Sequence, residues 1–308
     1  MKGISRLMTT FVILLLVSQQ LFSQKIRIAT YNIRVDVAAD AKKGDGWEQR
    51  CPKICDIIKL HDFELFGLQE AKSHQLKAVL SLLPGYSAIG VARDDGKERG
   101  EYSPILYKNE RFSLLDNGTF WLAPDPSKPA LGWDAACIRI CTWGKFKDKK
   151  NGFVFWMFNT HMDHIGVVAR IEGARVIVSK MKEITKSSDN VLISGDFNVD
   201  QRSEVYEFFK NSWNLKDSYE ITPFRLAWTG TMNGFNPDMI SDSRIDHIFV
   251  GPGFEVMRYG ILTDSYRTLI SDEERKQPDF PKEMTFKKSV VRFPSDHYPV
   301  MIEVSTER

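Results

Sequence analysis

The sequence has no excess of charge of either sign, and this limits the partners that it could attract. Its 308 residues include 42 Lys and Arg against 40 Asp and Glu. Residues 1–23 hold Lys2 and Arg6 and no acid, so residues 24–308 carry 40 charges of each sign. A balanced chain exerts no general attraction on polyanions, and binding nucleic acid would need a local basic groove.

An apolar run long enough to span a membrane is also missing. The run near the N-terminus, Phe11 to Val17, is too short to cross a bilayer. Together with its basic start and the polar stretch ending at Ser23, it predicts a secretory signal peptide over residues 1–23. We therefore expect residues 24–308 to be exported, periplasmic or secreted, without stable membrane insertion. An uncleaved anchor is the alternative, and the lack of a cysteine near the cut argues against a lipid anchor.

Cysteine is scarce, with Cys51, Cys55, Cys137 and Cys141 as the four examples. An exported protein can form disulfides, and four cysteines permit three pairings. However, each pair shares one face of a predicted helix or strand among apolar neighbours, which favours buried thiols. Their spacing lacks the short separation typical of zinc ligands, so a zinc site is not expected.

Linkers rich in proline, glycine and serine are missing, as are repeats and low-complexity segments, which favours a single domain over residues 24–308. Apolar patterns predict many short strands, the first from Lys25 to Asn32, and helical periodicity predicts helices over residues 46–61, 73–83, 166–187 and 202–212. Strands outnumber helices, so the expected class is α/β (α+β), with packed mixed sheets and helices outside. Residues 94–102 and 264–294 are expected to be long loops.

Polar residues stand where many of the predicted strands meet a turn. Acids, amides and histidines occupy six such junctions: Asn32, Glu70, His161 with Asp163, Asp196 with Asn198, Asp246, and Asp296 with His297. Each residue alone fits a turn or a structural hydrogen bond. Six groups of this kind, with no lysine among them, favour one shared catalytic site.

This set of side chains suits hydrolysis at phosphorus. Mg²⁺ prefers hard oxygen ligands, and one or two carboxylates with an amide oxygen are enough to hold it. A bound cation can polarise a phosphoryl group and activate water, while a histidine oriented by a carboxylate can move a proton near neutral pH. The sequence contains no G-x-S-x-G motif, so a nucleophilic serine of that type is not indicated.

In order and spacing, "TYNIR", "LFGLQE", "NTHMDH", "SGDFN", "RIDHIF" and "SDHYPV" resemble the motifs of the endonuclease/exonuclease/phosphatase family, which includes pancreatic-type deoxyribonuclease. The resemblance spans Lys25 to Val304 and indicates a secreted bacterial-type member. It implies a four-layered sandwich of two mixed β-sheets flanked by helices. It also implies a divalent-metal-dependent phosphoester hydrolase, either a phosphodiesterase or a phosphomonoesterase, with Mg²⁺ as the cofactor and Mn²⁺ as the alternative.

The resemblance also implies which residues hold the metal and the attacking water. Asn32 and Glu70 would hold the metal, with Asp296 as a further ligand or an orienting group. Asp196 would position or activate the water, while Asn198 would contact the phosphate. These roles place residues from several strands around one cation.

The histidines of the motifs are implied to act at the phosphorus centre. His161 would bind the phosphate or assist the leaving group, and "GEYSPILY" suggests Glu101 as its partner. His297 would stabilise or protonate at phosphorus, held by Asp246. Arg34 lies near the expected mouth of the site and is a candidate substrate contact.

Other side chains near the motifs have less specific roles. His247 alternates with Asp246 along its strand and is expected to face away from the site. Four aromatic residues outside the motifs could line a pocket for a base or a sugar, or pack in the core: Trp133, Phe224, Trp228 and Phe235.

A small phosphoester is the leading expectation for the substrate, and an exported nuclease is the alternative. A nuclease would need a basic or aromatic track for the polymer. A lipid substrate would call for an exposed apolar wedge, which the charged segment 264–294 is expected to lack. A non-catalytic binding module would show gaps among the polar strand ends, and none is seen. No obligate protein partner is implied.

Overall fold

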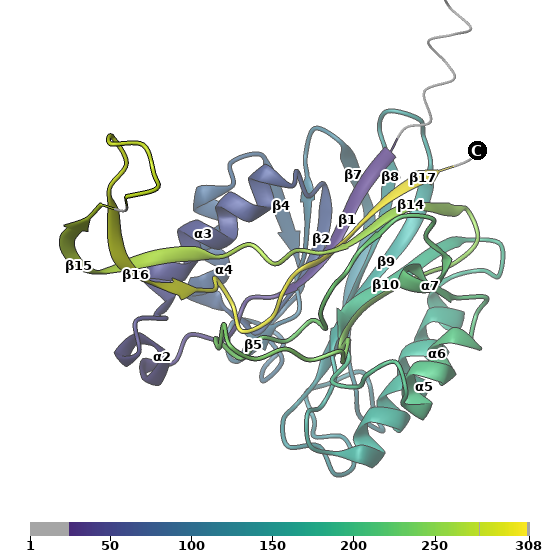
Figure 1. The fold of residues 1–308 in the computed structure, drawn as a ribbon. Helices are drawn as coiled ribbons and strands as arrows, with labels where there is room; N and C mark the ends of the chain where they lie inside the picture. The colour runs from purple at the N-terminus through teal and green to yellow at the C-terminus, as the bar shows by residue number, and fades with distance from the viewer. Residues whose placement is uncertain (1–24, 277, 307–308) are drawn as a thin grey trace, which may run out of the picture.

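Two large β-sheets form the centre of the chain in the computed structural model, which describes residues 25–276 and 278–306 (Figure 1). The predicted signal peptide lies outside the described residues. The first sheet has seven strands in the order β12-β14-β17-β1-β2-β6-β4 and the second has six in the order β11-β13-β10-β9-β8-β7. The first comprises β1 (Lys25–Asn32), β2 (Leu65–Gln69), β4 (Tyr86–Ile89), β6 (Ile105–Lys108), β12 (Arg225–Leu226), β14 (Phe254–Ile261) and β17 (Val300–Thr306). The second comprises β7 (Phe112–Trp121), β8 (Ile140–Asp148), β9 (Val154–His161), β10 (Asn190–Asp196), β11 (Lys216–Asp217) and β13 (Asp246–Val250).

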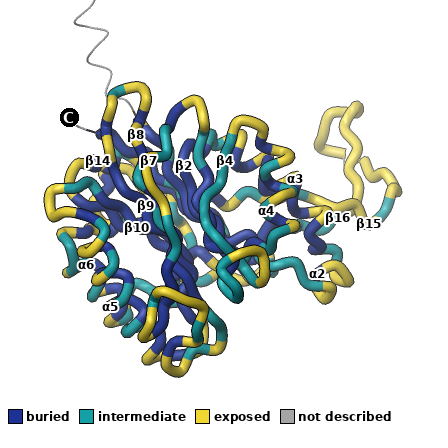
Figure 2. The backbone as a smooth tube through the Cα atoms, turned by 180° about the vertical axis from the view of Figure 1, so that it is seen from behind, coloured by how far each residue is buried: buried dark blue, intermediate teal, exposed yellow. Residues whose placement is uncertain are grey.

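Helices cover the outer face of each sheet. The helices α3 (Trp47–Leu60) and α4 (Ser73–Leu82) pack on the first sheet, and α5 (Val167–Ile184) and α6 (Glu204–Lys210) pack on the second (Figures 1 and 2). Two shorter helices, α2 (Ala38–Lys42) and α7 (Ser218–Ile221), complete the set. Within the described ranges, no helix combines the length and apolar character needed to cross a membrane. The layer order confirms the predicted four-layered sandwich.

The facing surfaces of the two sheets form the central core. Ile28 and Ile302 of the first sheet belong to one buried cluster with Met157 and Leu192 of the second, and all four are fully buried. Burying a side chain of this size contributes about 1.5–3 kcal/mol. Because the central strands are covered on both faces, β2 and β13 consist of continuous buried runs rather than an alternating pattern.

Strand directions bring the predicted motif residues to one edge of the sandwich. β1 runs parallel to β2, and β9 runs parallel to β10, so Asn32, Glu70, His161 and Asp196 all lie where these strands end. β13 runs antiparallel to β10 and pairs Asp246 with Asp196. The topology thus places residues from five strands on the same side of the molecule.

A buried amide joins the two sheets beneath this edge. Asn159 Nδ2 donates to the carbonyls of Leu68 at 2.9 Å and Pro104 at 3.0 Å, while its Oδ1 accepts from Gln69 Nε2 at 2.8 Å. Gly67 lies directly against this amide, and a Cβ atom there would be 2.1 Å from Asn159 Oδ1. Glycine is therefore required at residue 67 for the sheets to approach each other.

Gly67→Ala should lower the free energy of unfolding by about 3 kcal/mol, because the added methyl group displaces Asn159 and its buried hydrogen bonds. Urea unfolding followed by circular dichroism measures the change. Gly173→Ala on α5 is the matched control, since a Cβ atom there would lie 3.5 Å from its nearest neighbour. It should be neutral or stabilising by up to about 1 kcal/mol. Equal urea midpoints for the two variants would contradict this account.

Residues 264–294 differ from their prediction as a loop. β15 (Tyr266–Arg275) and β16 (Phe286–Arg292) pair antiparallel in a hairpin that projects from the sandwich (Figure 1). Closely spaced charges hide the strand pattern in the sequence. The hairpin also exposes Leu269 and Ile270, at 55% and 58%, and the expectation that this segment lacks an apolar wedge for a bilayer stays a prediction. A second small sheet pairs β3 (Ala71–Lys72) with β5 (Glu101–Tyr102).

All four cysteines are free thiols in the structure. Cys51 and Cys55 are buried on α3, Cys141 is buried on β8, and Cys137 is half-buried. The structure therefore agrees with the interpretation of these residues as thiols, although Cys137 is less enclosed than predicted.

Candidate active site

Asp196 lies at the centre of a cluster that joins both sheets. Its Oδ2 accepts a hydrogen bond from Asn32 Nδ2 at 3.0 Å and lies 3.4 Å from His161 Nε2 and 3.8 Å from His297 Nε2. Its Oδ1 accepts from the backbone N–H of Asn198 at 2.9 Å. The carboxylate at the end of β10 is thus the point where the predicted motif residues meet.

Asn32 and Glu70 form the side of the cluster that belongs to the first sheet. Asn32 Nδ2 also donates to Glu70 Oε1 at 2.9 Å, and its Oδ1 accepts from the backbone N–H of Arg34 at 3.0 Å. Glu70 Oε2 accepts from the backbone N–H of Val35 at 2.8 Å. Burial by itself would raise the pKa of Glu70, but the hydrogen bonds and the charge of His297 outweigh it and lower that pKa. Glu70 is therefore a carboxylate at neutral pH.

His297 and Asp246 form a buried pair on the opposite side of Asp196. His297 Nδ1 lies 2.9 Å from Asp246 Oδ2, and the backbone N–H of Asp246 donates to Thr231 Oγ1 at 3.1 Å. Burial by itself would lower the pKa of His297, but the charges of Asp246 and Asp196 raise it well above its usual value. The imidazole ring therefore holds a proton near neutral pH, with Asp246 fixing its orientation.

His161 and Asn198 occupy the third side. His161 Nε2 lies 3.1 Å from Asn198 Nδ2, which also donates to the carbonyl of Met162 at 2.9 Å. Because Nε2 accepts from this amide, the ring proton is on Nδ1, which is buried and has no hydrogen-bond partner within the described residues. Burial and the charge of Arg139 lower the pKa of His161 well below its usual value. His161 is therefore neutral, in contrast to His297.

Glu101 does not orient His161. Its Oε2 accepts from Arg93 Nη1 at 2.6 Å, so the predicted pairing of Glu101 with His161 was wrong. A guanidinium provides a charge-assisted hydrogen bond, which a neutral imidazole cannot match. Burial raises the pKa of Glu101 above its usual value.

Asp296 and Arg34 lie at the rim of the cluster. Asp296 Oδ2 is 3.5 Å from Arg34 Nη1, and its Oδ1 is 3.3 Å from Ser295 Oγ. The carbonyl of Asp296 accepts from the backbone N–H groups of Asn233 and Gly234 at 2.7 and 3.0 Å. The structure brings both predicted residues to the site, where Asp296 stays a predicted ligand or orienting group and Arg34 a predicted substrate contact.

The acidic groups of the cluster suit a divalent cation. Two sets of side chains can each bring one ligand atom per residue within 4.8 Å of the others: Glu70 with His161 and Asp196, and Asp196 with Asp246 and His297. The second set already holds the protonated His297, which disfavours a cation there. In the first set, burial and the charge of Asp246 raise the pKa of Asp196 to about 7. A bound cation would stabilise the ionised carboxylate and so offset the cost of burying its charge. The carboxylate oxygens of Glu70 and Asp196 are hard ligands that suit Mg²⁺ or Mn²⁺, whereas the nitrogen of His161 is not a ligand that Mg²⁺ prefers.

Two other motif residues have structural roles. His247 is buried, and its Nε2 lies 3.0 Å from the carbonyl of Val199, so it faces away from the site as predicted. Asp163 Oδ1 accepts from the backbone N–H groups of Ile165 and Gly166 at 2.9 and 2.7 Å. Asp163 therefore fixes the chain between β9 and α5.

Several residues that support the cluster had no signal in the sequence. Thr231 and Asn233 belong to a loop without a recognisable pattern, yet they bind Asp246 and Asp296 as described above. Arg139, which directly precedes β8, places Nη2 at 3.0 Å from His164 Nδ1. These contacts join segments that are distant in the sequence, so local patterns could not have revealed them.

Comparisons with known proteins agree with this arrangement. The sequence profile described as "Endonuclease/Exonuclease/phosphatase family" matches residues 29–297. The crystal structure of a protein of that family from Bacteroides thetaiotaomicron is 45% identical, with a TM-score of 0.85 over 92% of this chain and 98% of the other. A mannosyl-6-phosphatase of Bacteroides thetaiotaomicron VPI-5482 is 45% identical, with a TM-score of 0.83 over 91% and 99% of the two chains.

A curated relative matches a smaller part of the chain. An uncharacterized protein of Acanthamoeba polyphaga mimivirus is 30% identical over 127 residues, which cover 36% of this chain. The match spans 18% of that viral protein, so it concerns a segment of a much longer chain. The profile match and the two bacterial structures, in contrast, cover nearly the whole sandwich. The chain therefore belongs to the endonuclease/exonuclease/phosphatase family, a family of hydrolases.

Proposed function

We propose that the protein is a divalent-metal-dependent phosphomonoesterase that removes phosphate from phosphorylated sugars. The cluster around Asp196 carries this proposal. It offers two carboxylates, Glu70 and Asp196, for a cation. It also places the neutral His161 and the protonated His297 within 3.8 Å of Asp196 Oδ2. The mannosyl-6-phosphatase that shares 45% of its residues supports a sugar phosphate over other esters.

In the proposed site, Glu70 and Asn32 would hold the cation, with Asp196 facing it and Asp296 as the further predicted ligand. Bound Mg²⁺ or Mn²⁺ would supply positive charge at the phosphoryl oxygens. His161 and Asn198 stay the predicted phosphate contacts. For this role Asn198 Nδ2 would have to turn from His161 Nε2 toward a phosphoryl oxygen, and His161 would need its ring proton on Nε2. This arrangement leaves Asp196 directed at the position of the attacking water.

Proton transfer follows from the contrasting pKa values of the buried groups. Asp196 would accept a proton from water while the water oxygen bonds to phosphorus, because its carboxylate lies at the centre of the cluster, beside His161 and His297. The bond from phosphorus to the sugar oxygen breaks, and His297, whose pKa is raised, can donate a proton to that oxygen. Asp246 keeps the His297 ring oriented throughout.

We also propose that the protein acts outside the cytoplasm after residues 1–23 are removed. The basic start and the short apolar run support a signal peptide. N-terminal sequencing of the exported protein should begin at Gln24, and a mature protein that still begins at Met1 would argue against cleavage.

A substrate panel tests the proposed reaction. With Mg²⁺, the protein should hydrolyse mannose 6-phosphate or glucose 6-phosphate with kcat/KM at least ~10-fold above bis-p-nitrophenyl phosphate and a single-stranded oligonucleotide. EDTA should lower activity to about 1% or less, and Mg²⁺ or Mn²⁺ should restore it. Phosphate release measures hydrolysis of the sugar phosphates, the absorbance of p-nitrophenol measures hydrolysis of the diester, and gel electrophoresis measures cleavage of the oligonucleotide.

Each contrary outcome points to a different alternative. Faster cleavage of the oligonucleotide would favour an exported nuclease. Full activity in EDTA would exclude the metal from the mechanism. Binding of sugar phosphates without hydrolysis of any substrate would favour a module that retained the fold without its chemistry.

A further inference from the structure

Arg50 is a buried cation without an acidic partner. Its side chain extends from α3 and is fully buried. All of its side-chain hydrogen bonds go to backbone carbonyls, those of Asp45 at 2.7 Å, Ile33 at 2.7 Å, Pro294 at 3.0 Å and Arg34 at 3.2 Å. A buried charge is costly unless it is paired. Within the described residues no carboxylate lies at hydrogen-bonding distance, so an ion pair does not explain why a charged residue is buried here.

The other buried arginines of the described chain each have a carboxylate nearby. Arg111 pairs with Glu64 and with Asp148, in each case at 2.8 Å. Arg139 Nε lies 3.5 Å from Asp163 Oδ2. These guanidinium groups follow the usual pattern, in which an acid balances a buried positive charge.

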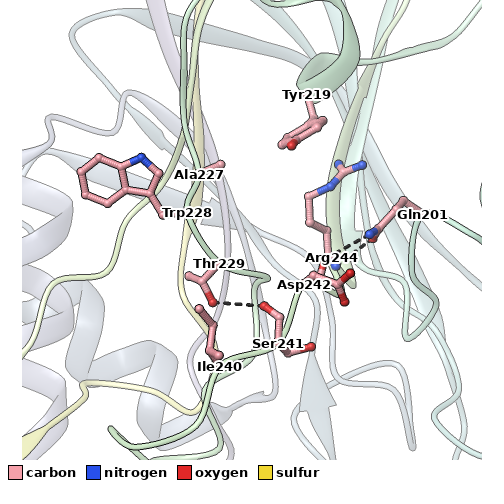
Figure 3. Close-up of a pocket in the computed structure, with 9 residues that line it drawn as sticks. All are labelled: Gln201, Tyr219, Ala227, Trp228, Thr229, Ile240, Ser241, Asp242 and Arg244. Carbon is pink, nitrogen blue, oxygen red and sulfur yellow. Dashed lines mark hydrogen bonds between the residues drawn. The ribbon is translucent and has the colours of Figure 1, made fainter.

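Arg244 follows the same pattern at a different place in the fold. It lies in the wall of a cavity of about 440 Å³, over the ring of Tyr219 at 3.8 Å (Figure 3). Its Nη1 pairs with Asp217 Oδ2 at 2.8 Å. Trp228, for which the sequence allowed a pocket or a core position, borders the same cavity and is 86% exposed. Of the four arginines buried in the described ranges, Arg50 alone therefore lacks a carboxylate partner.

Arg50 binds the rear of a peptide group that orients Asn32. Its Nη1 donates to the carbonyl of Ile33, and the N–H of that peptide group belongs to Arg34 and donates to Asn32 Oδ1 at 3.0 Å. The peptide bonds of the described chain are all trans, so the C=O and the N–H of one group point in opposite directions. The guanidinium therefore lies behind this peptide group, with the amide of Asn32 in front of it.

The next peptide group repeats this arrangement for Glu70. Arg50 Nη2 donates to the carbonyl of Arg34, and the N–H of that group belongs to Val35 and donates to Glu70 Oε2 at 2.8 Å. Arg34 lies between the two peptide groups and has a φ of 57°, a strained conformation that the surroundings must support. One guanidinium thus fixes two successive peptide groups, each of which holds a predicted metal ligand.

The same guanidinium reaches the segment that carries Asp296. Its Nη1 also donates to the carbonyl of Pro294, two residues before Asp296, and Ser295 Oγ donates to the carbonyl of Asn32 at 2.7 Å. Burial lowers the pKa of Arg50, whereas the charge of Asp296 opposes this more than any other charge does. Arg50 therefore joins the two segments that carry predicted ligands and places its positive charge near Asp296.

We propose that Arg50 is a positioning residue of the candidate metal site, which holds Asn32 and Glu70 in the orientation that a divalent cation needs. It acts through backbone carbonyls rather than as a ligand. Lysine cannot take this role, because its ammonium is a compact point charge, whereas the planar guanidinium binds several carbonyls in a fixed geometry. The inference rests on the divalent cation of the proposed function, but metal binding can be measured without catalysis.

Mn²⁺ binding to the metal-free protein, measured by the loss of the EPR signal of free Mn²⁺, tests this role. Arg50→Lys should raise the Kd for Mn²⁺ at least ~10-fold, because the partners that orient metal ligands typically change affinity by this amount. Arg111→Lys is the matched control, since it makes the same exchange at a buried arginine that binds the carbonyl of Lys25, at the opposite end of β1 from Asn32. Its Kd should equal that of wild type.

The rise in Tm that Mn²⁺ causes is the second measurement, and it applies even where a variant is less stable than wild type. A cation that binds only the folded state raises Tm by an amount that depends on its Kd. At equal Mn²⁺ the rise should be smaller in Arg50→Lys than in Arg111→Lys, and smaller still in Arg50→Gln, which also removes the charge. A purely structural role would lower the Tm of these variants without changing the rise.

The possible outcomes separate the role of Arg50 from the proposed function. Equal Mn²⁺ affinity in Arg50→Lys and wild type, with hydrolysis that still requires a metal, would overturn the role of Arg50 and leave the proposed function standing. An equal loss of affinity in Arg111→Lys would also overturn it, because the loss would then come from general instability. A wild-type protein that binds no Mn²⁺ and keeps full activity in EDTA would overturn both.

Discussion

Replacing Asp196 with asparagine should lower kcat on a sugar monophosphate by about 1,000-fold in the presence of Mg²⁺. Asparagine cannot accept the proton of the attacking water, and its neutral amide gives the cation and His297 no negative charge. The variant keeps nearly the same side-chain volume, so the buried cluster remains filled. Steady-state phosphate release measures the loss, and kcat should fall more than KM changes.

Stability measurements separate this catalytic loss from unfolding. The pKa of Asp196 rises from 3.8 to about 7 through burial and the charge of Asp246. A carboxyl with a higher pKa in the folded state loses stabilising free energy as the pH rises through that range. In EDTA at pH 8, Asp196→Asn should therefore have a Tm equal to or above that of wild type.

Asp56→Asn is the matched control for Asp196→Asn. Asp56 lies on α3 with 63% of its side chain exposed, so its substitution should alter neither kcat nor Tm. A folded Asp196→Asn protein that keeps more than about a tenth of the wild-type kcat would exclude Asp196 as the group that activates water.

Replacing His297 with alanine should have the second largest effect, a loss in kcat of at least ~100-fold. The substitution removes the protonated ring that faces Asp196 Oδ2 at 3.8 Å and leaves Asp246 without its partner at 2.9 Å. Asp246→Asn should act in the same direction, because an amide cannot stabilise the imidazolium form of His297. Phosphate release by the three proteins at neutral pH measures both effects.

Added imidazole gives a test specific to the chemistry of His297. It should restore part of the activity of His297→Ala, since the cavity left by the ring can take a free imidazole, and it should not help Asp196→Asn. His61→Ala is the control, because His61 pairs with Asp264 at the end of α3, away from the cluster. Wild-type kcat in His297→Ala, or an equal loss in His61→Ala, would contradict the assigned role.

The backbone around the cluster adopts conformations that side chains seldom tolerate. Arg34, Glu70 and Asn198 have φ values of 57°, 63° and 49°. Residues in the left-handed region carry a conformational cost of about 1–3 kcal/mol, which the surrounding structure must offset. In each case the main chain turns sharply at the end of a strand, and this turn directs a side chain or an N–H group into the site. Three of the eight non-glycine residues with positive φ in the described ranges thus lie at the cluster, which is consistent with a functional site, although such strain is not confined to it.

Much of the fold and the membership of the site could be predicted from the sequence. Buried strands and amphipathic helices leave periodic patterns, so β1, β10, α3 and α5 were recognisable from residue order alone. The polar residues at strand ends were visible for the same reason, because they interrupt apolar runs. The resemblance of six motifs then indicated the family and the four-layered sandwich.

The sequence did not reveal which of these side chains contact one another. Glu101 looked like the partner of His161, yet on β5 it accepts a hydrogen bond from Arg93, a guanidinium whose contact the motif did not indicate. Thr231 and Asn233 support Asp246 and Asp296 from a loop without any motif. The hairpin of β15 and β16 was missed because its charges conceal the alternation of a strand.

The sequence by itself determined most of the strands of the two large sheets, the four longer helices and the identity of the polar groups at the strand ends. Only the tertiary structure decided that His297 is charged while His161 is neutral, and that Trp228 lies open beside a cavity. The physical reason is distance along the chain. Periodicity reports the burial of neighbouring residues, whereas pKa values and cavities arise from contacts such as that between Ser295 and Asn32, 263 residues apart.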